Sequence, residues 1–158
     1  HIKKKYDGYL ILSCDFIGVQ WNLIKRIFSI FNDIKNKINY VGSTAHVEIK
    51  KNNINVDKSV VKVILNKKND IIYLSRNQIP SNYKRLVKVF SHHGPVCLKR
   101  DYLNNYKNLK NTNLQLSEDN EWLKFIENGN QIRSVLVSKI NQEINNKQDL
   151  KRINKKNV

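Results

Sequence analysis

One acidic side chain, Asp15, comes directly after the apolar run 9–14 (YLILSC). Such a run predicts a buried strand, and α/β sheets bind their ligands beyond the carboxyl ends of the strands. A carboxylate in that place offers the oxygen ligands that Mg²⁺ prefers. An aspartate after a strand also forms turns and caps helices, so the residue alone leaves a metal ligand and a turn former as alternatives.

A second candidate, Arg76, comes near the end of the segment 60–80 (VVKVILNKKNDIIYLSRNQIP). Two apolar runs around a polar connector predict a hairpin, and the proline that follows predicts a rigid turn. The guanidinium is a planar, permanently charged fork that suits a carboxylate or a phosphate. A surface salt bridge is the alternative role for an arginine in this place.

His92, His93 and Gly94 form a third candidate group at the predicted entry of a strand. Neighbouring strand residues point to opposite faces, and no cysteine or acid lies at zinc-ligand spacing, so a zinc site is not favoured. We expect one histidine to face a pocket as a hydrogen-bond donor. Farther along, Glu118 and Glu121 are predicted to share a helix face, where they either contact a hydroxylated ligand or supply a stabilising acidic first turn.

The elements around these residues alternate between helix and strand. Apolar residues recur at helical spacing over 24–34, and 39–49 alternates like a strand. Strand, helix and strand in this order indicate a crossover unit and an α/β sheet. Farther along, we predict a short helix near 100–106, a loop over 104–113, a helix over 117–129 that Ser117 caps and Gly129 ends, a strand over 131–139 and a final helix over 148–154.

The totals describe an ordinary folded chain of 158 residues, 40% hydrophobic and 27% charged, which we interpret as a single domain spanning 1–158. The net charge of +16 could attract a polyanion, but no aromatic residues interleave with the lysines, so nucleic acid is not the favoured partner. No apolar run approaches the roughly 18 residues that cross a bilayer, so no membrane partner is expected. Cys14 and Cys97 lie in apolar segments and are predicted to be reduced and buried, as in a cytoplasmic protein.

Four motifs, in this order, resemble those of the 3-deoxy-manno-octulosonate cytidylyltransferases, the CMP-KDO synthetases. The family's V-V-K-V-V…Y-F-S-R-x-x-I-P motif is similar to residues 60–64, 73–76 and 79–80. Its H-x-G…R-R-D-F-L motif is similar to residues 92–94 and 99–103. Its L-E-x-x-E-x-L-E-Q-L-R-x-L-E-N-G helix and its closing V-D-T-P-E-D-L are similar to residues 114–129 and 144–150.

The resemblance covers nearly the whole chain and implies a Rossmann-like nucleotidyltransferase fold, the nucleotide-diphospho-sugar transferase fold, with its amino-terminal part missing. In this family the anomeric hydroxyl of an acidic sugar attacks the α-phosphate of CTP, pyrophosphate leaves, and Mg²⁺ neutralises charge on the phosphates. The implied partners are CTP, 3-deoxy-manno-octulosonate and a second copy of the chain in a homodimer. The implied role is lipopolysaccharide precursor synthesis in the cytoplasm.

Two residues correspond to metal ligands in this resemblance. Asp15, also an expected catalytic residue, matches the metal-binding acid of the family's Q-G-D-E-P motif. Asn145 takes the place of the second metal aspartate. The resemblance therefore implies that these two side chains hold Mg²⁺.

Five residues correspond to positions that face the acidic sugar. Arg76, His92 and Glu118 fall at those positions, and Gln115 and Glu121 fall there by a weaker match of the motif. Arg76 and His92 are also expected to be catalytic. On this basis the predicted hairpin ends in a rigid turn so that Arg76 points at an anionic substrate.

Departures from the motifs define an alternative. The family's phosphate-gripping I-P-A-R…S-R-x-P-G-K segment has no counterpart, residues 13–17 (SCDFI) replace Q-G-D-E-P, and Val96 replaces the tyrosine of H-x-G-x-Y. The alternative is a degenerate, non-catalytic relative that binds a sugar acid or acts as a dimerising subunit. For either case we expect this chain by itself to show little turnover.

Overall fold

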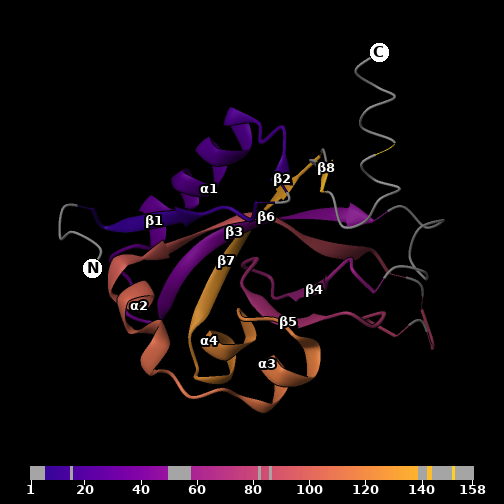
Figure 1. The fold of residues 1–158 in the computed structure, drawn as a ribbon. Helices are drawn as coiled ribbons and strands as arrows, with labels where there is room; N and C mark the ends of the chain where they lie inside the picture. Colours follow the sequence, from indigo (N-terminus) through magenta and orange to yellow (C-terminus); the bar gives the residue numbers. More distant parts are fainter. Residues whose placement is uncertain are drawn as a thin grey trace.

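The structure is built on a six-stranded mixed sheet (Figure 1). The computed structural model describes residues 6–14, 16–49, 58–81, 83–85, 87–138, 142–143 and 151. The sheet contains β1 (Gly8–Ile11), β3 (Tyr40–Ile49), β4 (Lys62–Leu65), β5 (Ile71–Ser75), β6 (Val89–Lys99) and β7 (Gln131–Val137). A separate two-stranded ladder pairs β2 (Phe16–Ile17) with β8 (Gln142–Glu143). The helices are α1 (Trp21–Ile34), α2 (Arg100–Asn105), the 3-10 turn η2 (Tyr106–Asn108), α3 (Asn113–Glu118) and α4 (Leu123–Glu127).

The order of strands is β5-β4-β6-β3-β7, and β1 pairs with β6 beside that path. Strand β6 runs antiparallel to β1, β3 and β4, whereas β3 and β7 are parallel. Because β1 and β3 both oppose β6, they run in the same direction, and α1 connects them. The predicted crossover unit is therefore confirmed, with β6 inserted between its two strands.

Helix α1 covers one face of the sheet because its apolar residues lie on one side. The buried residues of α1 are Leu23, Ile27, Phe31 and Ile34, which recur every three or four positions as in an amphipathic helix. The first three pack against Ala45, Val47, Cys97 and Val137 of the sheet. Full burial of one such large side chain stabilises the fold by about 1.5–3 kcal/mol.

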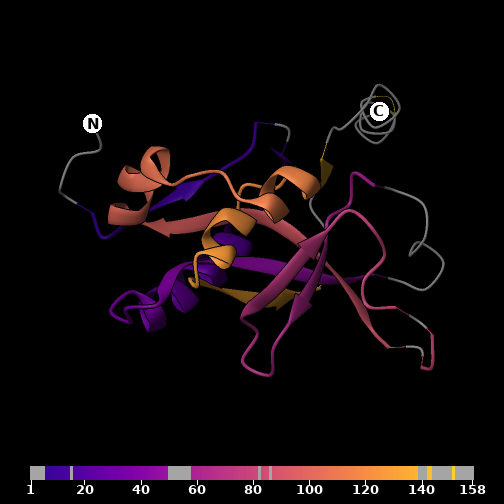
Figure 2. The same ribbon diagram turned by 90° about the horizontal axis from the view of Figure 1, so that it is seen from below.

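The second layer lies on the other face, where α2, α3 and α4 are found (Figures 1 and 2). Leu123 and Phe125 of α4 are fully buried and form a core cluster with residues of the hairpin and of the sheet. The other buried members of this cluster are Val41, Val63, Ile71, Leu74, Val96, Leu98 and Ile132. The sheet is therefore covered on both faces, as the predicted α/β class requires.

The predicted helix over 117–129 is wrong, because the chain forms two short helices there. Helix α3 ends at Glu118, and Asp119 adopts a left-handed conformation with φ of +46°, which aspartate tolerates better than most residues. Asn120 is buried, and its Oδ1 accepts the Trp122 N–H at 3.1 Å, so it occupies the break between the helices. Ser117 lies inside α3 and caps nothing, whereas Gly129, with φ of +78°, follows the end of α4 as predicted.

Strand β1 is shorter and more exposed than its apolar sequence predicts. It ends at Ile11, its residues are only half-buried, and β6 is its hydrogen-bonded neighbour within the described part of the chain. Cys14 is exposed, which corrects the prediction that it is buried, while Cys97 is buried as predicted; both are free thiols. An apolar run at the edge of a sheet has one backbone side without a partner strand and a partly open face.

Two predicted boundaries also shift. His92 and His93 lie in the interior of β6 and not at its entry. The predicted loop over 104–113 contains the end of α2 and the turn η2. The predicted final helix over 148–154 lies outside the described residues except for Lys151, which is helical.

The turn of the β4–β5 hairpin is organised by Asn66. Its Oδ1 accepts the backbone N–H groups of Lys68 and Asp70 at 2.8 and 2.9 Å, as asparagine commonly does in turns. Asn69 takes a left-handed conformation, and its carbonyl accepts the Ser134 N–H of β7 at 2.8 Å. The tip of the hairpin therefore reaches across to the far edge strand of the sheet.

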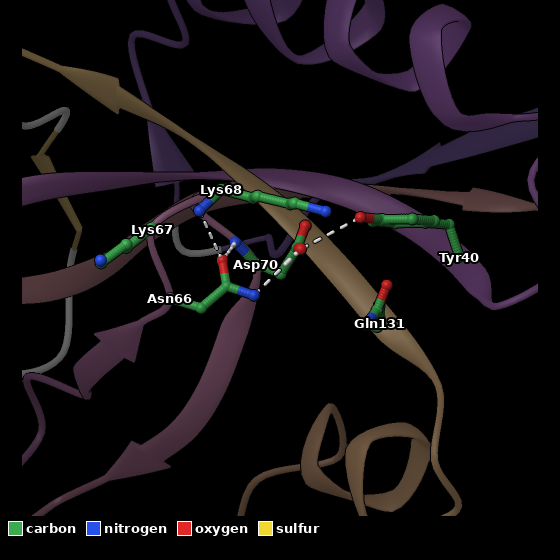
Figure 3. Close-up of a pocket in the computed structure, with 6 residues that line it drawn as sticks. All are labelled: Tyr40, Asn66, Lys67, Lys68, Asp70 and Gln131. Atoms are coloured by element: carbon green, nitrogen blue, oxygen red, sulfur yellow. Dashed lines mark hydrogen bonds between the residues drawn. The ribbon is translucent and has the colours of Figure 1, made fainter.

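An ion pair between Asp70 and Arg133 stabilises this contact, and Figure 3 shows Asp70 with its other partners, Asn66 and Tyr40. Arg133 Nε donates to Asp70 Oδ1 at 2.7 Å, Tyr40 Oη donates to Oδ2 at 3.0 Å, and Arg133 Nη2 also contacts Tyr40 Oη. Only 3% of Asp70 is exposed. Burial alone raises the pKa of Asp70, but the hydrogen bonds from Arg133, Asn66 and Tyr40 outweigh it and leave the pKa below its ordinary value.

We predict that Asp70→Asn destabilises the protein by about 3 kcal/mol, because it leaves the Arg133 charge buried without its partner. Chemical denaturation at pH 7 measures the change. The matched control is Asp101→Asn, which removes an exposed pair with Arg100 at 3.0 Å and should change the free energy of unfolding by less than about 0.5 kcal/mol. Equal effects of the two substitutions would contradict the role assigned to Asp70.

Candidate functional site

Arg76 and His92 each come directly after a residue of the same transverse row of paired strand residues in the sheet. Ser75 pairs with Lys62, and Lys62 pairs with Ser91, on three neighbouring strands. The next residue on each outer strand is Arg76 and His92, and the His92 N–H donates to the Val61 carbonyl between them at 2.8 Å. Two strand spacings correspond to about 10 Å. The fold thus brings these two predicted site residues to the two sides of β4, with His46 of β3 opposite His92.

The guanidinium of Arg76 is held by the carboxyl end of α3. Its Nε donates to the Glu118 carbonyl at 2.8 Å, and Nη2 donates to the Asp119 carbonyl at 3.0 Å. Nη1 donates to the Lys58 carbonyl at 3.3 Å. A cation is favourable at the carboxyl end of a helix because the carbonyl dipoles point there. These carbonyls already engage Nε, Nη1 and Nη2 of the guanidinium, so two-point binding of a carboxylate by Arg76 requires some of these hydrogen bonds to break.

The carboxylate of Glu118 faces the end of β5. It accepts hydrogen bonds from Tyr73 Oη at 3.1 Å, from Ser75 Oγ at 2.7 Å and from the Arg76 N–H at 2.8 Å. Burial alone raises the pKa of Glu118, but these hydrogen bonds and the Arg76 charge outweigh it and lower the pKa. Glu118 of α3 therefore binds the end of the hairpin, and Arg76 at the end of the hairpin binds α3. The role of each residue toward a sugar stays a prediction.

The other two predicted sugar ligands lie near Glu118 but differ in their surroundings. Gln115 Oε1 accepts the Thr112 N–H at 3.2 Å, which satisfies a free donor at the start of α3. Glu121 is exposed. Because α3 ends at Glu118, the prediction that Glu118 and Glu121 share a helix face is wrong.

His92 and His93 point to opposite faces of β6. His92 is partly buried, and its Nε2 lies 3.0 Å from Thr44 Oγ1. His93 is buried, with its ring centroid 5.3 Å from that of Phe16. Burial lowers the pKa of each to about 4, and for His92 the neighbouring His93 and His46 contribute. No group of three or more His, Cys, Asp or Glu side chains among the described residues could hold a metal ion.

Asp15 and Asn145, the predicted metal ligands, lie outside the described residues. Both residues next to Asp15 are described, and Glu143 is the described residue that comes before Asn145. Phe16 pairs with Glu143 in the β2–β8 ladder, and Phe16 also contacts His93. The ladder therefore brings the segment that follows Asp15 beside the segment that precedes Asn145, and Phe16 of this ladder contacts β6.

A hollow of about 340 Å³ opens at the tip of the hairpin, beside Asp70 (Figure 3). It is lined by Tyr40, Asn66, Lys67, Lys68, Asp70 and Gln131. None of the residues predicted from the sequence to bind substrate lines it. The hollow is therefore separate from the row that carries Arg76 and His92.

Sequence analysis missed Lys62, which supports that row. Lys62 is only 4% exposed, and its Nζ donates to the Arg76 carbonyl at 2.9 Å. A lysine is almost never buried without a partner. A lysine inside the apolar run 60–65 was the available signal, whereas no sequence signal marks Thr44 or His46.

The fold corresponds to that of a nucleotidyltransferase. The chain superposes with a TM-score of 0.86 on a solved structure of CMP:2-keto-3-deoxy-manno-octonic acid synthetase complexed with CTP. The match covers 94% of this chain and 61% of that chain, at 23% sequence identity. The predicted Rossmann-like nucleotidyltransferase fold is therefore confirmed.

The family follows from the sequence comparisons. The model of a family described as cytidylyltransferase matches residues 20–156, and the chain belongs to this family. It is 32% identical over 101 residues to the 3-deoxy-manno-octulosonate cytidylyltransferase of Protochlamydia amoebophila, a match covering 61% of this chain and 39% of the relative. The enzyme of the same name from Leptospira interrogans is 39% identical over 87 residues, covering 55% and 35%. That from Synechococcus elongatus is 35% identical over 102 residues, covering 62% and 41%.

These matches cover only part of each relative. The chain spans 35% to 41% of the length of these three curated relatives. Within the described ranges, no helix has the length and apolar character required to span a membrane.

We predict that the stability contributed by Glu118 depends on pH. The folded pKa lies below the ordinary value of 4.5, so the carboxylate stabilises the fold above that pH, and this contribution is lost as the pH falls through the folded pKa. Glu118→Gln should lower the free energy of unfolding by about 1–2 kcal/mol at pH 7, and the difference from the unmodified protein should narrow below pH 4.5. Denaturation curves at a series of pH values measure this difference.

The control is Glu121→Gln, because Glu121 is an exposed neighbour. It should leave the free energy of unfolding nearly unchanged at every pH. A Glu118→Gln effect that is independent of pH would contradict the ionised carboxylate as its source.

Proposed function

We propose that this chain forms part of a cytidylyltransferase that transfers CMP from CTP to 3-deoxy-manno-octulosonate with release of pyrophosphate. The observation that carries the proposal is the family match over residues 20–156. The relatives named above support the acceptor sugar, and the CTP complex of the solved structure supports the nucleotide. The row that holds Arg76 and His92 lies inside the matched range.

In this proposal the residues of the chain bind and orient the sugar. Arg76 and His92 lie on either side of Val61, and the Arg76 cation favours an anionic ligand beside them. Arg76 is fixed by α3 and not free to follow a ligand. A rigid cation loses little entropy on binding, which favours a ligand held in one orientation.

We propose Mg²⁺ as the metal, held by Asp15 with Asn145. Both side chains offer oxygen, the ligand atom that Mg²⁺ prefers, and the β2–β8 ladder pairs the segments next to them. When bound, the ion would neutralise charge on the CTP phosphates. We also propose a homodimer, a cytoplasmic location and a role in lipopolysaccharide precursor synthesis, and light scattering of the purified chain tests the first of these.

Binding measurements test the proposed function. We expect calorimetric titration of residues 1–158 to show CTP binding that requires Mg²⁺ and binding of 3-deoxy-manno-octulosonate. Pyrophosphate release should be slow for this chain alone, because the phosphate-gripping segment of the family motif has no counterpart in it. The methyl ester of the sugar acid is the matched control, and it should bind at least about tenfold more weakly because it carries no charge.

Two outcomes would decide against the proposal. Binding of the sugar acid without any binding of CTP and Mg²⁺ would favour the non-catalytic relative. Absence of binding for both ligands would overturn the assignment of a cytidylyl transfer function to this chain.

A further inference from the structure

Thr44 lies at an irregularity in the pairing of β3 with β6. Ser43 pairs with Cys97 and Ala45 pairs with His93, so three residues of β6, 94–96, oppose Thr44 alone. Gly94 allows this bulge because its φ of +90° is strained for other residues. The bulge places the Pro95 carbonyl 3.1 Å from Thr44 Oγ1, and Thr44 is fully buried.

The Thr44 hydroxyl has two polar neighbours but only one proton. The Pro95 carbonyl can only accept a hydrogen bond, so the proton of Thr44 Oγ1 is donated to it. The second neighbour, His92 Nε2 at 3.0 Å, must then donate to the hydroxyl oxygen. This arrangement fixes the proton of the His92 ring on Nε2.

The other ring nitrogen of His92 is then a bare acceptor. Burial, with the neighbouring His93 and His46, lowers the pKa of His92 to about 4, so the ring is neutral at pH 7. Among the described residues, none hydrogen-bonds to His92 Nδ1, and the one buried side-chain polar atom without a partner is Thr112 Oγ1. His92 Nδ1 is therefore left without a partner among the described residues and is available to accept a hydrogen bond from a ligand.

We propose that Thr44 is a positioning residue that holds His92 in its Nε2–H tautomer, so that Nδ1 accepts a hydrogen bond from a hydroxyl group of the ligand. The part that concerns the ligand rests on the proposed function, whereas the tautomer does not. A neutral ring with a bare Nδ1 favours a hydroxyl donor and gives nothing to a carboxylate, which only accepts. The donor role predicted for a histidine here is replaced by an acceptor role.

The residues near this row would then contact different chemical groups of the ligand. The hydroxyl groups of a polyhydroxylated acid would lie toward His92, and its carboxylate would lie toward the cation of Arg76. A site that is built to hydrogen-bond a hydroxyl discriminates strongly against an analogue that lacks it. The orientation of the bound sugar would therefore depend on Thr44, which does not need to touch it.

Nitrogen NMR of the chain labelled with ¹⁵N-histidine tests the tautomer. The chain has four histidines, and the signals of His92 are assigned by their loss in His92→Gln. We expect a protonated Nε2 and a bare Nδ1 at pH 7 in the ligand-free protein. A protonated Nδ1, or a ring that exchanges between tautomers, would overturn the proposal.

Two substitutions of Thr44 separate positioning from packing. Thr44→Val keeps the shape and removes the acceptor, so the His92 signals should show a loss of the single tautomer. Thr44→Ser restores the hydroxyl and should restore the spectrum of the unmodified protein. His93, on the opposite face, is the internal control, and its signals should be the same in both variants. Unaltered His92 signals in a folded Thr44→Val protein would overturn the role of Thr44.

Addition of 3-deoxy-manno-octulosonate tests the ligand. We expect the Nδ1 signal of His92 to shift, and the affinity to fall about fivefold in Thr44→Val but not in Thr44→Ser. If calorimetry shows binding while Nδ1 stays unchanged, the acceptor role toward the ligand is overturned. If no sugar binds at all, the proposed function fails, and the tautomer measured in the free protein still decides the role of Thr44.

Discussion

Strand β6 hydrogen-bonds to three other strands, and this pairing places Arg76, His92 and Thr44 relative to one another. On one side it holds β4, and through β4 it holds the hairpin end that carries Arg76. On the other side it holds β3, which contributes Thr44 and His46. Backbone pairing fixes strand spacing and register to within one residue, because a slip by one position turns every side chain to the opposite face. The position of His92 on β6 therefore determines which residues surround it.

The cationic side chains of this protein donate hydrogen bonds to backbone carbonyls as well as to carboxylates. The net charge is +16, yet Arg76 and Lys62 both donate to carbonyl oxygens. Arg76 also forms an ion pair with the Asp119 carboxylate at 3.4 Å, but that carboxylate is exposed, whereas the Asp70 carboxylate that pairs with Arg133 is buried. The row near His92 thus keeps positive charge in a fixed place, and the Asp70–Arg133 pair serves the fold.

Much of the fold follows from local patterns. The hairpin over 60–76 was predictable because its apolar runs and its turn residues are adjacent in the sequence. Helix α1 was predictable because its buried residues recur at helical spacing. The break between α3 and α4 was not, because it depends on Asn120 being buried by the surrounding helices and on Asp119 adopting a left-handed conformation. The exposure of Cys14 could not be predicted from the sequence either, because an apolar run does not reveal whether its strand lies at the edge or the centre of a sheet.

The sequence by itself determined the family, the order of most elements and the candidates Arg76, His92 and Glu118, because each belongs to a motif of neighbouring residues. Only the tertiary structure decided what these side chains face. Arg76 meets the end of α3, Glu118 meets β5, and His92 meets Thr44, a residue 48 positions away in the sequence. Such partners come together through strand register and a bulge in β6, and a spacing along the chain does not encode contacts that depend on how separate strands align.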